Sequence, residues 1–130
     1  DYMFIDMPPG TGDVPLTVFQ MLPIDGIIIV SSPQELVSMV VAKSINMAKM
    51  MNIPIIGVVE NMAYIKCPKC DEKIRIFGNG HFDEDVARHG LDVLAEIPLD
   101  QNIAKAVDEG SLEDYDATFM NDVVDRIISR

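Results

Sequence analysis

A continuous apolar run rich in β-branched residues, Gly26–Ser31 (GIIIVS), constrains the fold of this chain more than any other stretch. An unbroken run of this kind is typical of a parallel strand that is covered on both faces, whereas a half-buried strand alternates apolar and polar residues. Two further runs, Pro54–Glu60 (PIIGVVE) and Val93–Ile97, have the same character, and a fourth, Tyr2–Asp6, opens the chain. We therefore predict four buried parallel strands.

Stretches with helical periodicity and helix-end signals separate these runs. We expect helices over Asp13–Leu22, Ser32 to about Met51, Phe82–His89, Asp100 to near Gly110, and Ala117–Ser129. Ser32-Pro33-Gln34-Glu35 has the form of a capping box, with Pro at the first helical position. Strands that alternate with helices predict an α/β fold with a three-layer, mostly parallel sheet.

The length and charge of the chain limit its organisation and its partners. With 130 residues and 48% hydrophobic content it can bury one core, so we expect a single domain over residues 1–130. A net charge of −11 argues against nucleic acid and anionic membranes as partners, because both attract basic surfaces. We find no transmembrane run and no secretory signal. Two cysteines are too few for a disulfide framework, which makes a cytoplasmic location the default.

The first predicted strand raises a question about its neighbours. Tyr2–Asp6 is strongly apolar, and nothing in the sequence precedes it. An unpaired apolar strand at the margin of a sheet promotes aggregation, and the chain also begins without methionine. We therefore expect an N-terminal portion to precede this sequence in the intact protein.

The stretch Asp6–Asp13 (DMPPGTGD) is the first candidate site. It places a carboxylate at the predicted carboxyl end of a strand, where open α/β sheets bind ligands and where Asp6 could hold Mg²⁺ through its waters. Gly10 and Gly12 would let backbone N–H groups approach a phosphate closely. The alternative is a simple strand–turn–helix junction in which Asp13 caps the helix. The complete string favours a nucleotide site.

Cys67-Pro-Lys-Cys70 is the second candidate site, in an insert at about 62–82. Two thiolates with this spacing can converge on one metal, but a Zn²⁺ site or a [4Fe–4S] cluster takes four ligands. A two-fold axis beside the motif would bring four thiolates together in a homodimer. The segment Lys73–Phe77 alternates like a hairpin strand that could support the cysteines.

Three other interpretations of the cysteines remain open. They could form a redox disulfide, although a thioredoxin-like motif would open a helix after a strand. His81 and His89 could complete a zinc site within one chain, although their spacing departs from zinc-finger patterns. The pair could also have no role. We favour a metal shared between two chains, with zinc competing for the same thiolates.

Taken in order, the motifs resemble the Mrp/ApbC-type ATPases, iron–sulfur cluster carriers in the MinD and nitrogenase iron-protein group of P-loop proteins. DMPPGTGD resembles their Walker B and switch II segment. Further agreement is found at Ser32-Pro33-Gln34, Gly57–Met62, Cys67–Cys70, Ile76-Phe-Gly78, Ile97–Asp100 and Asp108-Glu-Gly110. The resemblance covers nearly the whole chain and implies a partial P-loop NTPase fold.

The resemblance also implies roles for individual residues. Asp6 would bind Mg²⁺, and the Gly10 amide would contact the γ-phosphate of ATP. Asn61 would hydrogen-bond the adenine ring, with Pro98 and Leu99 lining the base pocket. The alternatives are a turn residue at a strand end for Asn61 and a strand terminator for Pro98. Cys67 and Cys70 would hold a [4Fe–4S] cluster, or Zn²⁺ in its place, across a homodimer and pass the cluster to recipient apoproteins.

The sequence departs from the family pattern in two respects. It lacks the Gly-rich Walker A loop with two lysines, and it lacks the switch I aspartate that would polarise the attacking water. We therefore predict the C-terminal part of such an ATPase, which alone would bind ATP poorly and hydrolyse none. Two alternatives are a non-catalytic metal-dependent dimerisation module and a MinD-like partitioning ATPase. The cysteine insert and the lack of a terminal basic amphipathic helix count against the latter.

Overall fold

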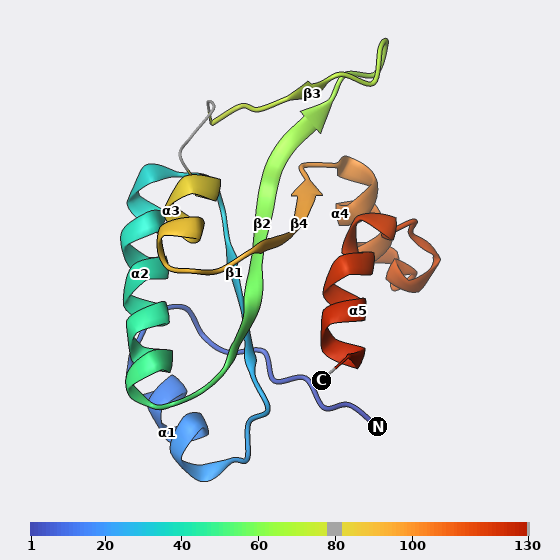
Figure 1. Ribbon diagram of the computed structural model, residues 1–130. Coiled ribbons are helices and arrows are strands. Elements are labelled where there is room, and N and C mark those ends of the chain that lie inside the picture. The colour runs from blue at the N-terminus through green and yellow to red at the C-terminus, as the bar shows by residue number, and fades with distance from the viewer. Residues whose placement is uncertain (78–81, 130) are drawn as a thin grey trace.

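The computed structural model describes residues 1–77 and 82–129, without the side chains of residues 35–38 and 40. Within this part the chain forms an α/β fold (Figure 1). Its helices and strands are α1 (Asp13–Met21), β1 (Ile27–Ser31), α2 (Glu35–Met50), β2 (Ile55–Lys66), β3 (Lys73–Ile74), α3 (Phe82–Arg88), β4 (Val93–Pro98), α4 (Gln101–Glu109) and α5 (Asn121–Ile128), with short 3₁₀ helices η1 (Leu112–Asp114) and η2 (Thr118–Met120).

The sheet is built around β2. β1 and β4 pair with it in parallel on its two sides, so that Val58 of β2 lies opposite Ile29 of β1 and Val93 of β4. The far end of β2 pairs antiparallel with β3, where Ile65 lies opposite Ile74. The sheet is therefore mostly parallel, as predicted, with one antiparallel hairpin at its end.

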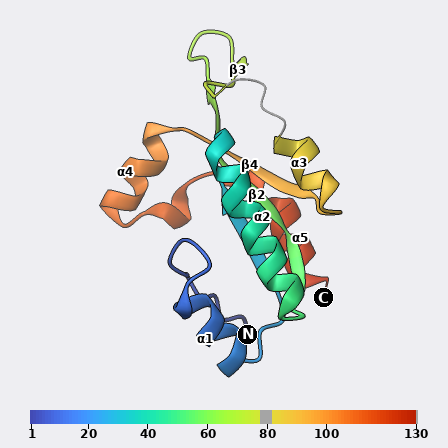
Figure 2. The ribbon, with the colours of Figure 1, turned by 90° about the vertical axis from the view of Figure 1, so that its left-hand side faces the viewer.

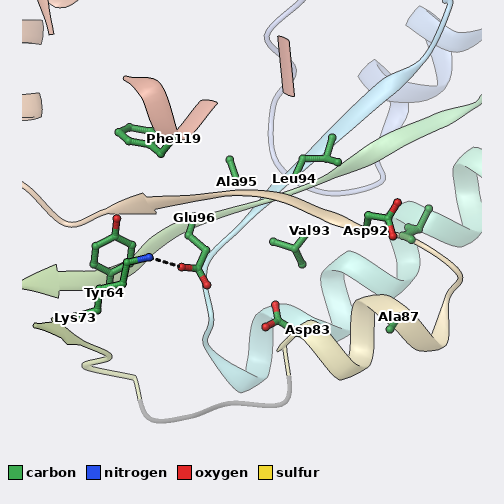
Figure 3. Close-up of a pocket in the computed structure, with 11 residues that line it drawn as sticks. Tyr64, Lys73, Asp83, Ala87, Asp92, Val93, Leu94, Ala95, Glu96 and Phe119 are labelled. Atoms are coloured by element: carbon green, nitrogen blue, oxygen red, sulfur yellow. Dashed lines mark hydrogen bonds and ion pairs between the residues drawn. The ribbon is translucent and has the colours of Figure 1, made fainter. Parts of the chain in front are cut away.

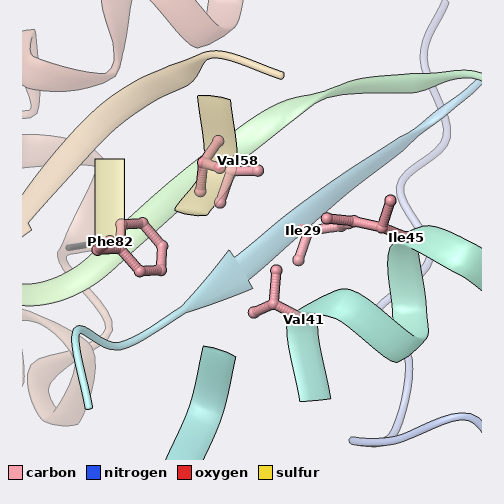
Figure 4. Packing of buried hydrophobic residues seen from close by; sticks show 6 residues of the cluster. Ile29, Val41, Ile45, Val58 and Phe82 are labelled. Carbon is pink, nitrogen blue, oxygen red and sulfur yellow. The ribbon is translucent and has the colours of Figure 1, made fainter. Parts of the chain in front are cut away.

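Helices cover both faces of the sheet. Because successive strand residues point to opposite faces, Val58 and Val59 enter different cores. On one face α2 and α3 pack against the sheet through Ile29, Val41, Ile45, Val58, Phe82 and Val86 (Figure 4). On the other face α5 contributes Val123 to a cluster with Val59, Leu94 and Ala95. In Figure 2, α2 lies in front of the sheet and α5 behind it. The predicted three-layer architecture is confirmed.

The prediction of a strand over Tyr2–Asp6 is wrong. These residues have no regular structure, and Tyr2, Met3 and Phe4 are 65%, 77% and 73% exposed. A strand exists only through hydrogen bonds to a neighbouring strand, and within the described residues no strand pairs with this segment. An apolar composition alone therefore did not produce a strand.

The ends of α2 and α4 test the helix-capping residues that the sequence predicts. The prediction that Ser32 caps α2 is wrong, because the extended Gln34 is the N-cap and separates Ser32 from the first turn. The side chain of Glu35 lies outside the described part. The predicted cap of α4 is confirmed, since Asp100 accepts a hydrogen bond from the Asn102 N–H at 2.8 Å. The left-handed Gly110 ends that helix, as expected.

Two predicted segments have different lengths in the structure. β2 extends to Lys66, so the irregular insert begins at Cys67 rather than at about residue 62. The predicted helix Ala117–Ser129 is split into η2 and α5. No helix in the described residues has the length and apolar character needed to cross a membrane.

Candidate functional site

The two cysteines lie on the turn between β2 and β3. The turn is closed by two backbone hydrogen bonds, from the Cys67 N–H to the Glu72 carbonyl at 2.9 Å and from the Asp71 N–H to the Cys67 carbonyl at 3.0 Å. Asp71 adopts a left-handed conformation with φ of 57°, which reverses the chain direction. Both cysteines are free thiols, and Cys70 is exposed. The turn that follows β2 projects at one end of the molecule (Figure 1). The hairpin therefore presents Cys70 to solvent, with Cys67 half-buried beside it.

The surroundings of Cys67 favour the thiolate. The backbone N–H of Lys69, then the thiol and the backbone N–H of Cys70, lower the pKa of Cys67 below its usual value. Hydrogen bonds to the charged form stabilise it, and the thiolate is the form that binds metals. The donor set of this hairpin therefore fits a thiolate-bound metal ion or iron–sulfur cluster.

One chain supplies only part of such a site. Within the described residues, no group of three or more His, Cys, Asp or Glu side chains is arranged to hold a metal ion. His89 ends the α3 region, where its carbonyl accepts a hydrogen bond from Lys49, and His81 lies outside the described residues. A site with four thiolates would need the hairpins of two chains.

A network of ion pairs attaches this hairpin to the sheet. Arg75, just beyond β3, contacts the carboxylates of Glu60 on β2 (3.4 Å) and Glu96 on β4. Lys73 of β3 pairs with Glu96 at 3.2 Å, and its Nζ lies 4.3 Å from the centre of the Tyr64 ring (Figure 3). The hairpin is therefore held by side chains that reach both neighbouring strands.

The two carboxylates of the network differ in their surroundings. Glu60 is 1% exposed, and this burial raises its pKa in spite of Arg75. Burial also acts to raise the pKa of Glu96, but hydrogen bonds from Arg75 and Lys73 outweigh it and lower the pKa below its usual value. Arg75 is thus the counter-ion of the most deeply buried charge in this network.

β2 is irregular where the predicted base-binding residue lies. The register between β2 and β4 shifts between Glu60 and Tyr64, and Met62 has a positive φ of 56°. The Asn61 Oδ1 accepts a hydrogen bond from the Met62 N–H at 2.9 Å. A left-handed backbone conformation is uncommon for a side-chain-bearing residue and costs energy, so the contacts around Met62 must maintain it.

The pairing of β2 with β4 brings Pro98 and Leu99 to the same part of the sheet. Pro98 lies opposite Tyr64, and the Leu99 N–H donates to the Tyr64 carbonyl at 2.8 Å. Leu99 is 44% exposed, whereas Pro98 is buried. Pro98 and Leu99 thus lie at the end of β4 beside Tyr64, three residues beyond Asn61 in the middle of β2. Their contact with a base stays a prediction.

The residues predicted for Mg²⁺ and phosphate lie in the irregular segment before α1. Asp6 is exposed and does not lie at the end of a strand. Gly10 has a φ of 95° and open space where a Cβ would lie, a conformation that favours glycine. Gly12, rather than Asp13, is the N-cap of α1. The roles of Asp6 and Gly10 stay predictions.

An open hollow of about 530 Å³ runs along β4, between α3 and η2 (Figure 3). Its lining includes Tyr64, Lys73, Asp83, Glu96 and Phe119. None of the residues predicted for nucleotide or metal lines it. It is therefore a separate feature from the base site predicted at Asn61.

Sequence reasoning missed the Glu60–Arg75–Glu96 network. The available signal was a glutamate at the end of an apolar strand, Pro54–Glu60, together with the alternation of Lys73–Phe77. A carboxylate that ends a buried run needs a cationic partner, and Arg75 in the following hairpin is such a partner.

Comparisons with known proteins agree with the motifs. The family model described as "ParA: NUBPL iron-transfer P-loop NTPase" matches residues 1–130. An iron-sulfur cluster carrier protein of Methanocaldococcus jannaschii is 50% identical over 111 residues, which cover 85% of this chain and 38% of that protein. The iron-sulfur cluster transfer protein NUBPL of Mus musculus is 44% identical over 110 residues, covering 85% of this chain and 34% of that protein.

A solved structure agrees as well. A nucleotide-binding protein from Archaeoglobus fulgidus, in complex with ADP and with cobalt, superposes with a TM-score of 0.77 at 43% identity. The match covers 88% of this chain and 47% of that one. The chain thus spans less than half the length of these relatives. It belongs to the NUBPL iron-transfer family of P-loop NTPases, the iron–sulfur cluster carriers.

Proposed function

We propose that the protein carries a [4Fe–4S] cluster between two copies of itself and delivers it to recipient apoproteins. The observation that carries this proposal is the hairpin, which presents Cys67 and Cys70 as free thiols with hydrogen bonds that favour the Cys67 thiolate. Each copy supplies two thiolates, so the four ligands of a cluster come from a homodimer. Zn²⁺ would occupy the same thiolates when iron is scarce.

Delivery requires that the cluster leave the hairpin without an oxidant or reductant. Thiolates of the recipient replace Cys67 and Cys70 on the iron atoms, and the carrier thiolates leave. The exposure of Cys70 gives an incoming thiolate access to the site. Free thiols also fit a reducing compartment, and we propose the cytoplasm.

Nucleotide is the second part of the proposal. In the intact protein ATP–Mg²⁺ would supply binding and hydrolysis energy that changes how tightly the cluster is held. Asp6 would hold the ion through its waters, the Gly10 amide would face the γ-phosphate, and Asn61, Pro98 and Leu99 would take the base. The ADP complex of the Archaeoglobus fulgidus protein supports a nucleotide at this fold.

Cluster transfer tests the proposal. The chain is reconstituted with iron and sulfide without oxygen, mixed with an apo-ferredoxin that takes a [4Fe–4S] cluster, and separated from it. Iron and sulfide should appear on the ferredoxin in the cluster ratio, and Cys67→Ser should prevent loading. If the loaded chain keeps its cluster in the presence of the apo-ferredoxin, carrier function is wrong and the alternative of a metal-dependent dimerisation module is favoured.

A further inference from the structure

β2 joins the predicted base site to the cysteine hairpin without a break. Asn61 lies on β2, and Cys67 directly follows the strand. At about 3.3 Å per residue, the two are roughly 20 Å apart. β1 pairs with β2 as far as Glu60, and the pairing of β2 with β4 resumes at Tyr64 after a shift of register. The two proposed sites therefore share one strand, and contacts that bridge its irregular part decide whether a displacement at one site reaches the other.

The strand is irregular at one place between these two sites. Met62 adopts a left-handed backbone conformation, and the register with β4 shifts between Glu60 and Tyr64. A bulge of this kind bends a strand and re-aims its side chains, here that of Asn61. Because the left-handed conformation costs energy for a residue with a side chain, the neighbouring contacts decide whether it persists.

The contacts of the hairpin lie on both sides of this bulge. Arg75 contacts Glu60, the residue directly before Asn61, and also Glu96 on β4. On the other side Lys73 lies over the ring of Tyr64, whose carbonyl accepts the Leu99 N–H. Glu60 is 1% exposed, so water cannot easily replace Arg75 as the partner of its carboxylate. Loss of the Arg75 contact would therefore leave a buried charge without a counter-ion.

The hairpin has few other attachments to the part of the chain that the structure describes. β3 is two residues long, and within that part it pairs only with Ile65 and Lys66 at the end of β2. A two-residue ladder cannot fix the angle between hairpin and sheet, whereas an arginine that contacts carboxylates on two strands can. Any movement of the cysteines on binding metal is thus transmitted to Glu60 through Arg75.

We propose that Arg75 is a positioning residue that couples the Cys67–Cys70 hairpin to the bulge at Asn61 and Met62. The proposal rests on the proposed function, since it needs a metal at the hairpin and a ligand near Asn61. Coupling is reciprocal: if metal at the hairpin shifts the bulge, a base bound at Asn61 shifts the affinity of the hairpin for metal by the same factor. The contacts of Arg75 with Glu60, the neighbour of Asn61, and with Glu96 are a physical route for it.

The test uses Zn²⁺ and nuclear magnetic resonance on the ¹⁵N-labelled chain. In the wild type, Zn²⁺ should shift the signals of Lys66 and Cys67, and also those of the Met62 amide and the Asn61 side-chain amide. In Arg75→Ala the shifts at Cys67 should remain, and those at Asn61 and Met62 should be lost. Arg75→Lys should restore part of them, because a lysine can reach one carboxylate at a time. Arg88→Ala is the matched control, since Arg88 pairs with Asp85 on α3 and should behave as wild type.

The outcomes separate this proposal from the proposed function. If Zn²⁺ shifts no signal near Cys67 in the wild type, both are wrong. If it binds there but Asn61 and Met62 do not respond, or respond equally in Arg75→Ala, only the coupling is wrong. Should Arg75→Ala fail to fold with Glu60 buried and unpaired, the double variant Glu60→Gln/Arg75→Gln removes both charges. It should likewise lose the distant shifts.

Discussion

Glu60 and Glu96 lie directly opposite each other on β2 and β4, and the guanidinium of Arg75 contacts both carboxylates. Two like charges at opposed positions of neighbouring strands destabilise a sheet, and Glu60 is almost completely buried. Arg75 therefore joins two strands that would otherwise repel at this position. Because Arg75 belongs to the cysteine hairpin, the stability of the sheet and the position of the thiols depend on the same side chain.

The first prediction concerns the stability of this contact. Arg75→Ala should lower the free energy of unfolding by about 2 kcal/mol, less than the roughly 3–5 kcal/mol for breaking a fully buried pair, because Arg75 is 31% exposed. Urea unfolding followed by circular dichroism measures it. Arg88→Ala removes an exposed pair and should cost less than about 1 kcal/mol. Equal losses in the two variants would contradict the role given to Arg75.

The second prediction concerns close packing between β2 and β4. A Cβ at Gly57 would lie 2.5 Å from the side chain of Leu94 and 3.2 Å from the Asp92 carbonyl. Gly57→Ala should therefore cost about 1–3 kcal/mol through overpacking, seen as a lower thermal midpoint. Gly12→Ala is the control, since nothing lies near its Cβ position and its φ is −77°. An unchanged midpoint for Gly57→Ala would show that β4 is not held this close.

The third prediction is a dependence on pH. The N–H of Asn102, together with Tyr115, lowers the pKa of Asp100. A carboxyl group with a lowered pKa in the folded state adds stability above its unfolded pKa of about 3.9, and this is lost as the pH falls through the folded pKa. Asp100→Ala should cost about 1 kcal/mol at pH 7 and progressively less below about pH 4. A cost for Asp100→Ala that is constant with pH would contradict this origin.

The fourth prediction concerns removal of metal. If four thiolates of two chains hold one metal centre, a strong chelator should convert dimer to monomer, and adding Zn²⁺ back should restore the dimer. Sedimentation velocity before and after chelation measures this. Cys70→Ser should be monomeric in both conditions. A dimer that survives complete metal removal would show that other surfaces hold the copies together.

The sequence predicts those strands whose own residues are apolar and β-branched throughout. The run Gly26–Ser31 and the runs that became β2 and β4 are apolar and β-branched, and the sheet covers them on both faces. Tyr2–Asp6 has a similar composition but no partner strand among the described residues, so it is not a strand. The length of β2 could not be predicted, because Asn61 and the left-handed Met62 interrupt the pattern while the strand continues.

The candidate site was predictable to the extent that it is local. The spacing of Cys67 and Cys70 indicates a metal-binding turn, and the structure places both on one hairpin. The Arg75 contacts with Glu60 and Glu96 join residues 15 and 21 positions apart, and they exist only because β3 folds back beside β2 and β4. The register of β3 against β2 cannot be predicted from composition, so the ion-pair network could be identified only from the structure.

Native mass spectrometry after anaerobic reconstitution shows directly whether two copies share one cluster through Cys67 and Cys70. We expect a species with the mass of two chains and one [4Fe–4S] cluster, which is absent for Cys67→Ser. A metal-free monomer, or a monomer that holds a complete metal centre by itself, would contradict it.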